Sequence, residues 1–163
     1  MPFPRRIRTL VLMAPAERRI TIEALLLPCL VSLGFRFFGV PRTQAWTRRW
    51  ATAGRDQFPA GGPDAIIRFA RRAQGRVSRA GGVLGPCLVR SLTLWAMLLR
   101  RGVSTNLRVG FRKRDGKIEG HAWVEHDQIP INEDRAEIET YAIYDRPVQF
   151  DMWLKPKDRA PIS

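Results

Sequence analysis

The sequence predicts a single α+β domain, in which helices come first and a small antiparallel sheet follows. Three observations favour this class. Apolar residues recur every three or four positions through much of residues 16–101, as they do on helix faces. From Leu107 onward apolar and polar residues alternate, which is typical of strands. A length of 163 residues with 45% apolar residues suits one domain with one core.

The first two helices are expected over residues 16–38 and 43–53. In the first, apolar residues follow one face: Ile20, Ala24, Leu27, Val31, Phe35 and Phe38. Because proline lacks a backbone donor, Pro28 should bend or split this helix. Thr43 is placed to cap the second helix, and Gly54 is placed to end it.

Two further helices precede the predicted sheet. One should cover residues 64–74, with Arg68, Arg71 and Arg72 on its outer face. Residues 78–86 contain three glycines and are expected to form a loop. The clearest helix then starts near Cys87, and Gly102 occupies the position of a C-terminal capping glycine.

An antiparallel meander is expected after this helix. The first strand covers residues 107–112, and 114–117, Arg-Asp-Gly-Lys, is a hairpin-turn pattern. A second strand is expected over 118–125 and a third over 128–131. Helices followed by antiparallel strands are the order found in α+β folds.

The net charge of +13 is concentrated in the N-terminal half. Residues 1–81 hold 15 basic and 4 acidic side chains, whereas residues 82–163 hold 13 and 11. We therefore divide the domain into a basic helical part (1–81), a part with the cysteine helix and the sheet (82–150) and a C-terminal tail (151–163). We expect the basic part to dock on an acidic surface of a protein partner.

Composition excludes several classes of protein. Cys29 and Cys87 are too few for a disulfide framework or a Cys-rich zinc site, so we expect neither a metal nor a cofactor. The longest apolar stretch, residues 24–35, is too short to cross a membrane. The apolar run at residues 10–14 is too short for a secretory signal. We therefore expect a cytoplasmic protein without an integral membrane span.

Cys87 and His121 are the candidate nucleophile and base. Cys87 follows a Gly-Pro pair at the first turn of its helix, where unpaired amides and the helix dipole stabilise a thiolate. Taken alone, such a cysteine is more often a small buried hydrophobe, and a histidine in mid-strand is as often a core residue. If the strands 118–125 and 128–131 pair, Glu133 or Asp134 can return to the second nitrogen of His121. Cys29 has no base near it in sequence and is expected to be buried.

These residues resemble the transglutaminase-like cysteine proteases of lasso-peptide biosynthesis, and more narrowly their stand-alone leader peptidase. The resemblance covers roughly residues 16–145. It depends on the cysteine-helix motif at 87–92 and on His-Ala-Trp-Val-Glu at 121–125, followed by Asn-Glu-Asp at 132–134. It implies that Cys87 is the nucleophile and His121 the general acid/base. The family has an aspartate as the third residue; by count that position falls on Glu133, but we favour its neighbour Asp134.

The resemblance also implies a set of partners. The substrate would be a lasso precursor peptide, whose leader is recognised by a separate small protein because this chain has no room for that domain. An ATP-dependent, asparagine-synthetase-like cyclase would then close the macrolactam. Two alternatives remain open: a transglutaminase-like acyltransferase, and a non-catalytic basic module that binds nucleic acid or an acidic protein. We expect no nucleic-acid partner, because no nucleic-acid-binding motif is present.

Overall fold

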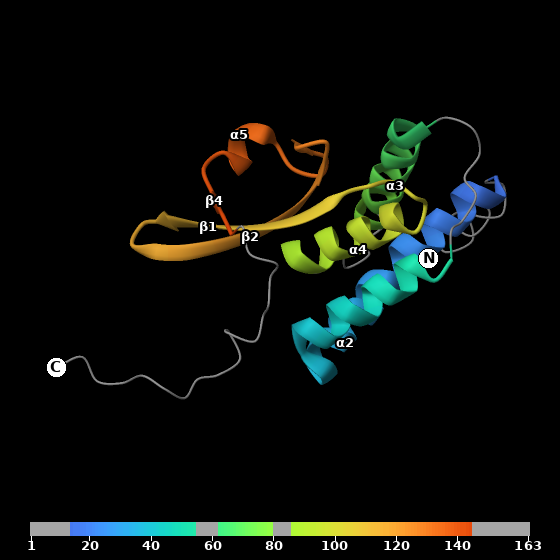
Figure 1. Ribbon diagram of the computed structural model, residues 1–163, viewed down its shortest axis with the longest axis horizontal. Helices are drawn as coiled ribbons and strands as arrows, with labels where there is room; N and C mark the ends of the chain where they lie inside the picture. Colours follow the sequence, from blue (N-terminus) through green and yellow to red (C-terminus); the bar gives the residue numbers. More distant parts are fainter. Residues whose placement is uncertain (1–13, 55–61, 80–85, 145–163) are drawn as a thin grey trace.

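The computed structural model describes residues 14–54, 62–79 and 86–144 of the chain. Helices and a sheet form separate parts of the molecule, as expected for an α+β fold (Figure 1). The elements, in order, are α2 (Pro15–Thr52), α3 (Gly62–Arg79), α4 (Cys87–Leu99), β1 (Asn106–Arg114), β2 (Lys117–His126), β3 (Ile129–Pro130), α5 (Arg135–Ile138) and β4 (Ala142–Ile143). The predictions for residues 1–13 and 151–163 lie outside the described residues.

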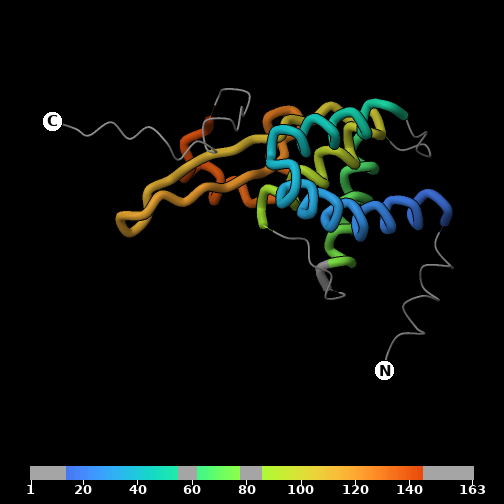
Figure 2. The backbone as a smooth tube through the Cα atoms, turned by 90° about the horizontal axis from the view of Figure 1, so that it is seen from below, coloured from blue at the N-terminus to red at the C-terminus, as the bar shows by residue number. Residues whose placement is uncertain are grey.

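The long helix α2 is two helices joined at Gly39, whose φ of 75° lies in the left-handed region that favours glycine. The two segments fold back beside each other (Figure 2). The sequence predicted separate helices over 16–38 and 43–53, and the break at Gly39 lies between them, as predicted. The helix is not split at Pro28, where the backbone stays helical. Thr43 does not cap the second segment: it lies inside the helix, where its hydroxyl donates to the carbonyl of Gly39 at 2.8 Å. The two segments approach so closely that a Cβ on Gly34 would lie 2.7 Å from Cγ2 of Thr43.

The helix α4 lies at the centre of the fold and packs against α2, α3, β1 and β2. Its buried side chains are mostly apolar and join those of α2 and α3 in the main core: Val89, Leu92, Leu94, Ala96, Met97 and Leu98. The predicted exposed face of α3 is confirmed, because Arg68, Arg71 and Arg72 are exposed. On the other face, Ile66, Ile67 and Ala70 are buried. Gly102 ends α4 with a φ of 75°, as predicted.

The four-stranded sheet has the order β3-β2-β1-β4. The predicted hairpin turn is confirmed: Asp115 and Gly116, between β1 and β2, both have positive φ angles. The third strand is shorter than predicted, with residues 129–130 in place of 128–131. The sequence did not predict α5 or β4, which carry the chain from the β3 edge of the sheet to the β1 edge.

Cys29 is exposed, so the prediction that it is buried was wrong. It lies on the face of α2 turned away from the buried Ala24, Leu27 and Val31. By length and composition, α2 could cross a membrane: an 18-residue window has a mean hydropathy of 1.7, and 22% of that window is buried in the molecule. Core helices of soluble proteins meet the same criterion. The break at Gly39 and the buried face of the helix show that α2 packs as part of this domain.

Candidate active site

Cys87 is the first residue of α4 and is half-buried. The preceding Pro86 is the N-cap and provides no side-chain hydrogen bond. Arg90 is the first residue of this helix whose N–H bonds back into the helix turn, to the carbonyl of Pro86 at 3.1 Å. The amides before it have no intrahelical partner, so the positive end of the helix dipole lies at the sulfur.

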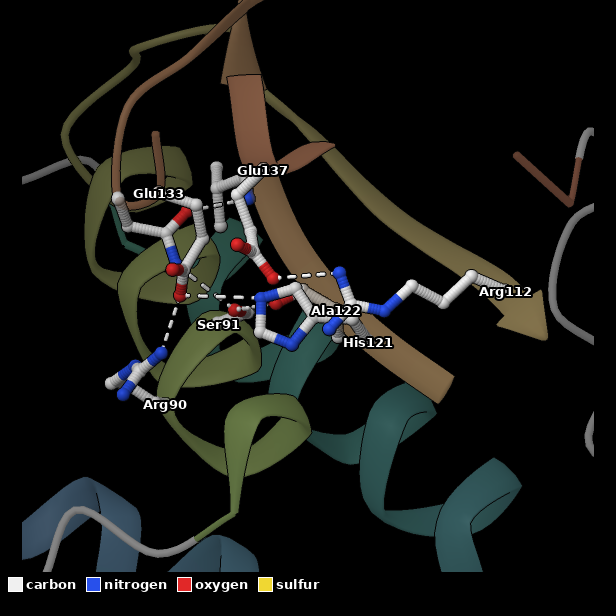
Figure 3. A network of polar contacts seen from close by, with 9 residues as sticks. Arg90, Ser91, Arg112, His121, Ala122, Glu133 and Glu137 are labelled. Carbon is white, nitrogen blue, oxygen red and sulfur yellow. Dashed lines mark hydrogen bonds and ion pairs between the residues drawn. The ribbon is translucent and has the colours of Figure 1, made fainter. Parts of the chain in front are cut away.

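A hydrogen bond fixes the first turns of α4 against β2. Ser91 lies one turn after Cys87 on the same side of the helix, and its hydroxyl donates to the carbonyl of Ala122 at 2.8 Å. Ala122 is the immediate neighbour of His121. The helix that carries the cysteine is therefore held against the strand that carries the histidine (Figure 3).

Asn132 extends this connection to the segment after β3. Its side-chain amide donates to the hydroxyl of Ser91 at 3.1 Å, while its side-chain oxygen accepts the N–H of Val124 at 2.7 Å. The N–H of Ile131 donates to the carbonyl of Val124 at 2.9 Å. These bonds hold residues 131–132 against β2 and so determine where the next residue, Glu133, is placed.

Glu133 is the carboxylate that the structure places beside His121. Its Oε1 lies 3.5 Å from Nε2 of His121 and also pairs with the guanidinium of Arg90 on α4 (Figure 3). Nε2 of His121 is buried and makes no hydrogen bond within the part of the chain that the structure describes. Apo active sites often contain such long contacts, which shorten when substrate binds.

Asp134, which we favoured from the sequence, has a different position. It is the N-cap of α5, where its carboxylate accepts the N–H of Ala136 at 3.0 Å, and it is exposed. A signal for this was present: Asp134 and Glu137 have the spacing of a helix capping pair. Of the two candidate carboxylates, the fold brings Glu133 to His121 and uses Asp134 to start a helix.

Tyr141 lies beside His121. The centre of its ring lies 5.4 Å from that of His121. The guanidinium carbon of Arg112 lies over the tyrosine ring, 4.4 Å from its centre. Burial raises the pKa of Tyr141; Arg112 opposes this, and negative charge on nearby acidic groups, including Cys87, raises it further. Tyr141 therefore packs beside the imidazole of His121 and beneath the charge of Arg112.

The sheet beneath this site is closely packed. Gly110 on β1 lies opposite His121 on β2. A Cβ at Gly110 would lie 2.9 Å from both the ring of Trp123 and the Cβ of Tyr141, so glycine is required for the rings to approach. Glu125 is buried and accepts the indole N–H of Trp123 at 2.8 Å. The ring that stacks beside His121 is therefore fixed.

The comparison with known families agrees with this geometry. Residues 30–144 match the model of the transglutaminase-like superfamily. The chain belongs to this superfamily. Neither the curated proteins nor the solved structures contain a match to it. Members of the transglutaminase-like superfamily typically use a cysteine for catalysis, so the arrangement of a cysteine at a helix N-terminus and a histidine on the adjacent sheet has a chemical precedent.

Three residues of this transglutaminase-like site were not predicted as functional from the sequence. Arg90, Asn132 and Tyr141 act through partners distant in sequence, and no local pattern indicates those partners. Arg90 and Asn132 lie within the sequence motifs at 87–92 and 132–134, but no role was predicted for either. Tyr141 follows a short helix that was not predicted. Among residues 14–54, 62–79 and 86–144, no group of three or more His, Cys, Asp or Glu side chains is placed to hold a metal ion.

Proposed function

We propose that the chain is a cysteine peptidase that removes the leader from a lasso-peptide precursor. The observation that carries the proposal is the set of contacts from α4 to the sheet. These contacts hold the helix that begins at Cys87 against the strand of His121 and keep Glu133 beside the imidazole, which supports a shared site for the three residues. The substrate class comes from the resemblance of the motifs at 87–92, 121–125 and 132–134 to the leader peptidases of this superfamily.

In the first half of the reaction, His121 accepts the thiol proton of Cys87 and the sulfur attacks the carbonyl carbon of the last leader residue. The helix N-terminus stabilises the negative charge that forms on the carbonyl oxygen. As the intermediate collapses, the C–N bond breaks. His121 then donates its proton to the departing amine of the core peptide. The leader is left as a thioester on Cys87.

In the second half, a water molecule replaces the amine. His121 removes a proton from the water, whose oxygen attacks the thioester carbonyl. The leader leaves with a new carboxyl group, and the proton returns to the sulfur of Cys87. Glu133 lies at the Nε2 side of the imidazole, so it orients the ring and stabilises the imidazolium that forms between these proton transfers.

The partners follow from the same resemblance. A separate recognition protein presents the leader, and an ATP-dependent, asparagine-synthetase-like cyclase uses the freed N-terminus.

Mass spectrometry of a mixture of the chain, a lasso precursor, the recognition protein and the cyclase should detect the free leader. Cys87→Ala should abolish cleavage, whereas Cys29→Ala, the matched thiol control, should retain it. Cleavage that survives Cys87→Ala would disprove the mechanism.

The second candidate activity is acyl transfer, which the superfamily match also supports. The thioester on Cys87 would then be attacked by an amine in place of water. The same assay with an added primary amine separates the two activities. A leader that ends in a carboxyl group indicates hydrolysis, and a leader that ends in an amide of the added amine indicates transfer.

A further inference from the structure

The first segment of α2 has apolar side chains on two opposite faces. One face packs in the core through Ile20, Ala24, Leu27 and Val31. The opposite face carries a second apolar row at steps of three and four residues. This outer stripe consists of Ile22, Leu26, Leu30, Leu33 and Phe37, all 42–70% exposed. It extends about 22 Å along the helix. A helix that is apolar all round is normally covered on every side, yet no described residue of this chain covers the outer stripe.

The outer stripe ends in a hollow at the bend of α2. This hollow has a volume of about 420 Å³ and is lined by Leu33, Phe37 and Phe38 from the first segment and by Arg42 and Trp46 from the second. Phe37 and Phe38 are 70% and 65% exposed. The bend, cyan in Figure 1, projects from the helical part at the end away from the N-terminus of α2. Large aromatic side chains are thus presented at a protruding end of the molecule.

The exposed charges around most of this surface are positive. Glu23, near the start of the stripe, is only 13% exposed and pairs with Arg101. Between Ala24 and Gly54 the sequence contains four arginines and no acidic residue. Arg36 and Arg42 flank the bend and are exposed, and neither pairs with an acidic side chain among the residues that the structure describes. Two copies of this surface would bring like charges together, which disfavours self-association.

We propose that the outer stripe and the bend of α2 bind the surface of an anionic lipid bilayer. A helix that lies in the interface buries a Leu- and Phe-rich face at the acyl boundary and places arginines among the headgroups. Tryptophan also prefers this interfacial layer, as Trp46 would in the hollow. Each basic residue near an anionic surface adds to the attraction, and the adaptable bilayer can cover a stripe and a projecting bend together. The association is peripheral, since the inner face of α2 stays in the core.

Vesicle flotation tests this surface directly. The full chain should float with vesicles of phosphatidylcholine and phosphatidylglycerol at a 3:1 ratio, at least about tenfold more than with phosphatidylcholine alone. Leu26→Ser with Leu33→Ser should lower this binding by about tenfold or more. Ile118→Ser with Ile129→Ser is the matched control, because both residues are at least as exposed but lie on the sheet. Arg36→Glu with Arg42→Glu should abolish the preference for anionic lipid.

Cys29 provides a local readout, because it is exposed beside the outer stripe. In a Cys87→Ser chain, an environment-sensitive fluorophore on Cys29 should shift to shorter wavelength when anionic vesicles are added. The same fluorophore at Asp115→Cys, in the distant β1–β2 turn of a chain that also carries Cys29→Ser and Cys87→Ser, should not shift. The proposal is wrong if the chain does not bind anionic vesicles, or if the Leu26/Leu33 variant binds as well as the wild type. It is also wrong if the Cys29 probe responds to an acidic amphipathic peptide but not to vesicles, because the surface then docks a protein.

Discussion

The sheet and the helix α2 differ in whether their arginines are paired with acidic side chains. On the sheet, Arg108 pairs with Glu125, and Arg112 pairs with Glu119 and Glu137. On the outer side of α2, arginines stand beside exposed leucines and phenylalanines. The sheet arginines Arg108 and Arg112 are thus paired within the chain, whereas Arg36 and Arg42 of α2 pair with no acidic side chain among the residues that the structure describes. We expect substitutions on the sheet to affect catalysis and stability, and those on α2 to affect association.

The largest expected effect separates the two histidines. His121→Ala removes the group that moves protons in both halves of the proposed reaction, so leader cleavage should slow by about 10³-fold or more. His126→Ala should change the rate by less than about threefold, because Nδ1 of His126 contacts the carbonyl of Ser104, outside the site. Single-turnover cleavage measures both. Equal losses from the two variants would show that the effect arises from folding and not from catalysis.

The next effect separates the adjacent carboxylates. Glu133→Gln removes the charge beside the imidazole and should lower the cleavage rate by about 10²-fold. Asp134→Ala should leave the rate within about twofold and instead lower the free energy of unfolding by about 1 kcal/mol, because it removes the cap of α5. Cleavage kinetics and urea unfolding of both variants test this prediction. If Asp134→Ala had the greater effect on the rate, the assignment of Glu133 would be wrong.

A third prediction compares charges in the two regions. Glu125 is buried and bonds both Trp123 and Arg108. Glu125→Gln weakens the bond to Arg108 at a buried position and should lower the free energy of unfolding by about 1–3 kcal/mol. Arg36→Gln, on the exposed side of α2, should change it by less than about 0.5 kcal/mol. Urea denaturation at neutral pH measures both values. A large loss from Arg36→Gln would contradict the contrast between the regions.

The smallest effect concerns pH. Burial raises the pKa of Tyr141 above its ordinary value of 10.0. The folded chain therefore keeps the phenolic proton when the unfolded chain loses it. This contribution to stability is complete below the unfolded pKa and is lost as the pH rises through the folded pKa. Stability should thus fall more steeply above pH 10 in the wild type than in Tyr141→Phe. Parallel curves in unfolding experiments between pH 8 and 11 would exclude this role.

The sequence predicted elements whose cause is local and failed where the cause is distant. The Asp115-Gly116 turn and the end of α4 at Gly102 depend on backbone conformations that neighbouring residues determine, and both were correct. The boundary between the helices predicted over 16–38 and 43–53 was also correct, and Gly39 supplies the positive φ needed to reverse the chain there; the split expected at Pro28 did not occur. The burial of Cys29 was also wrong, because an apolar helix does not indicate which of its faces the rest of the chain covers.

For the candidate site, too, the sequence predicted what depends on local patterns and missed what depends on distant contacts. Cys87 and His121 could be chosen from their positions at a helix start and in a strand, and the structure has both positions, with the two elements packed together. The choice between Glu133 and Asp134 depended on how the chain leaves β3. That path is determined by Asn132, which bonds to Ser91 and to Val124 at sequence separations of 41 and 8 residues. The periodicity of apolar residues in the sequence carries no information about such hydrogen bonds.

The carboxylate of Glu133 connects two elements of the candidate site. One oxygen of this group contacts Arg90 of α4 and His121 of β2 at the same time. The cysteine helix and the histidine strand therefore share a single ionic junction. Loss of this one carboxylate would therefore disturb the orientation of the imidazole and the attachment of the cysteine helix at the same time.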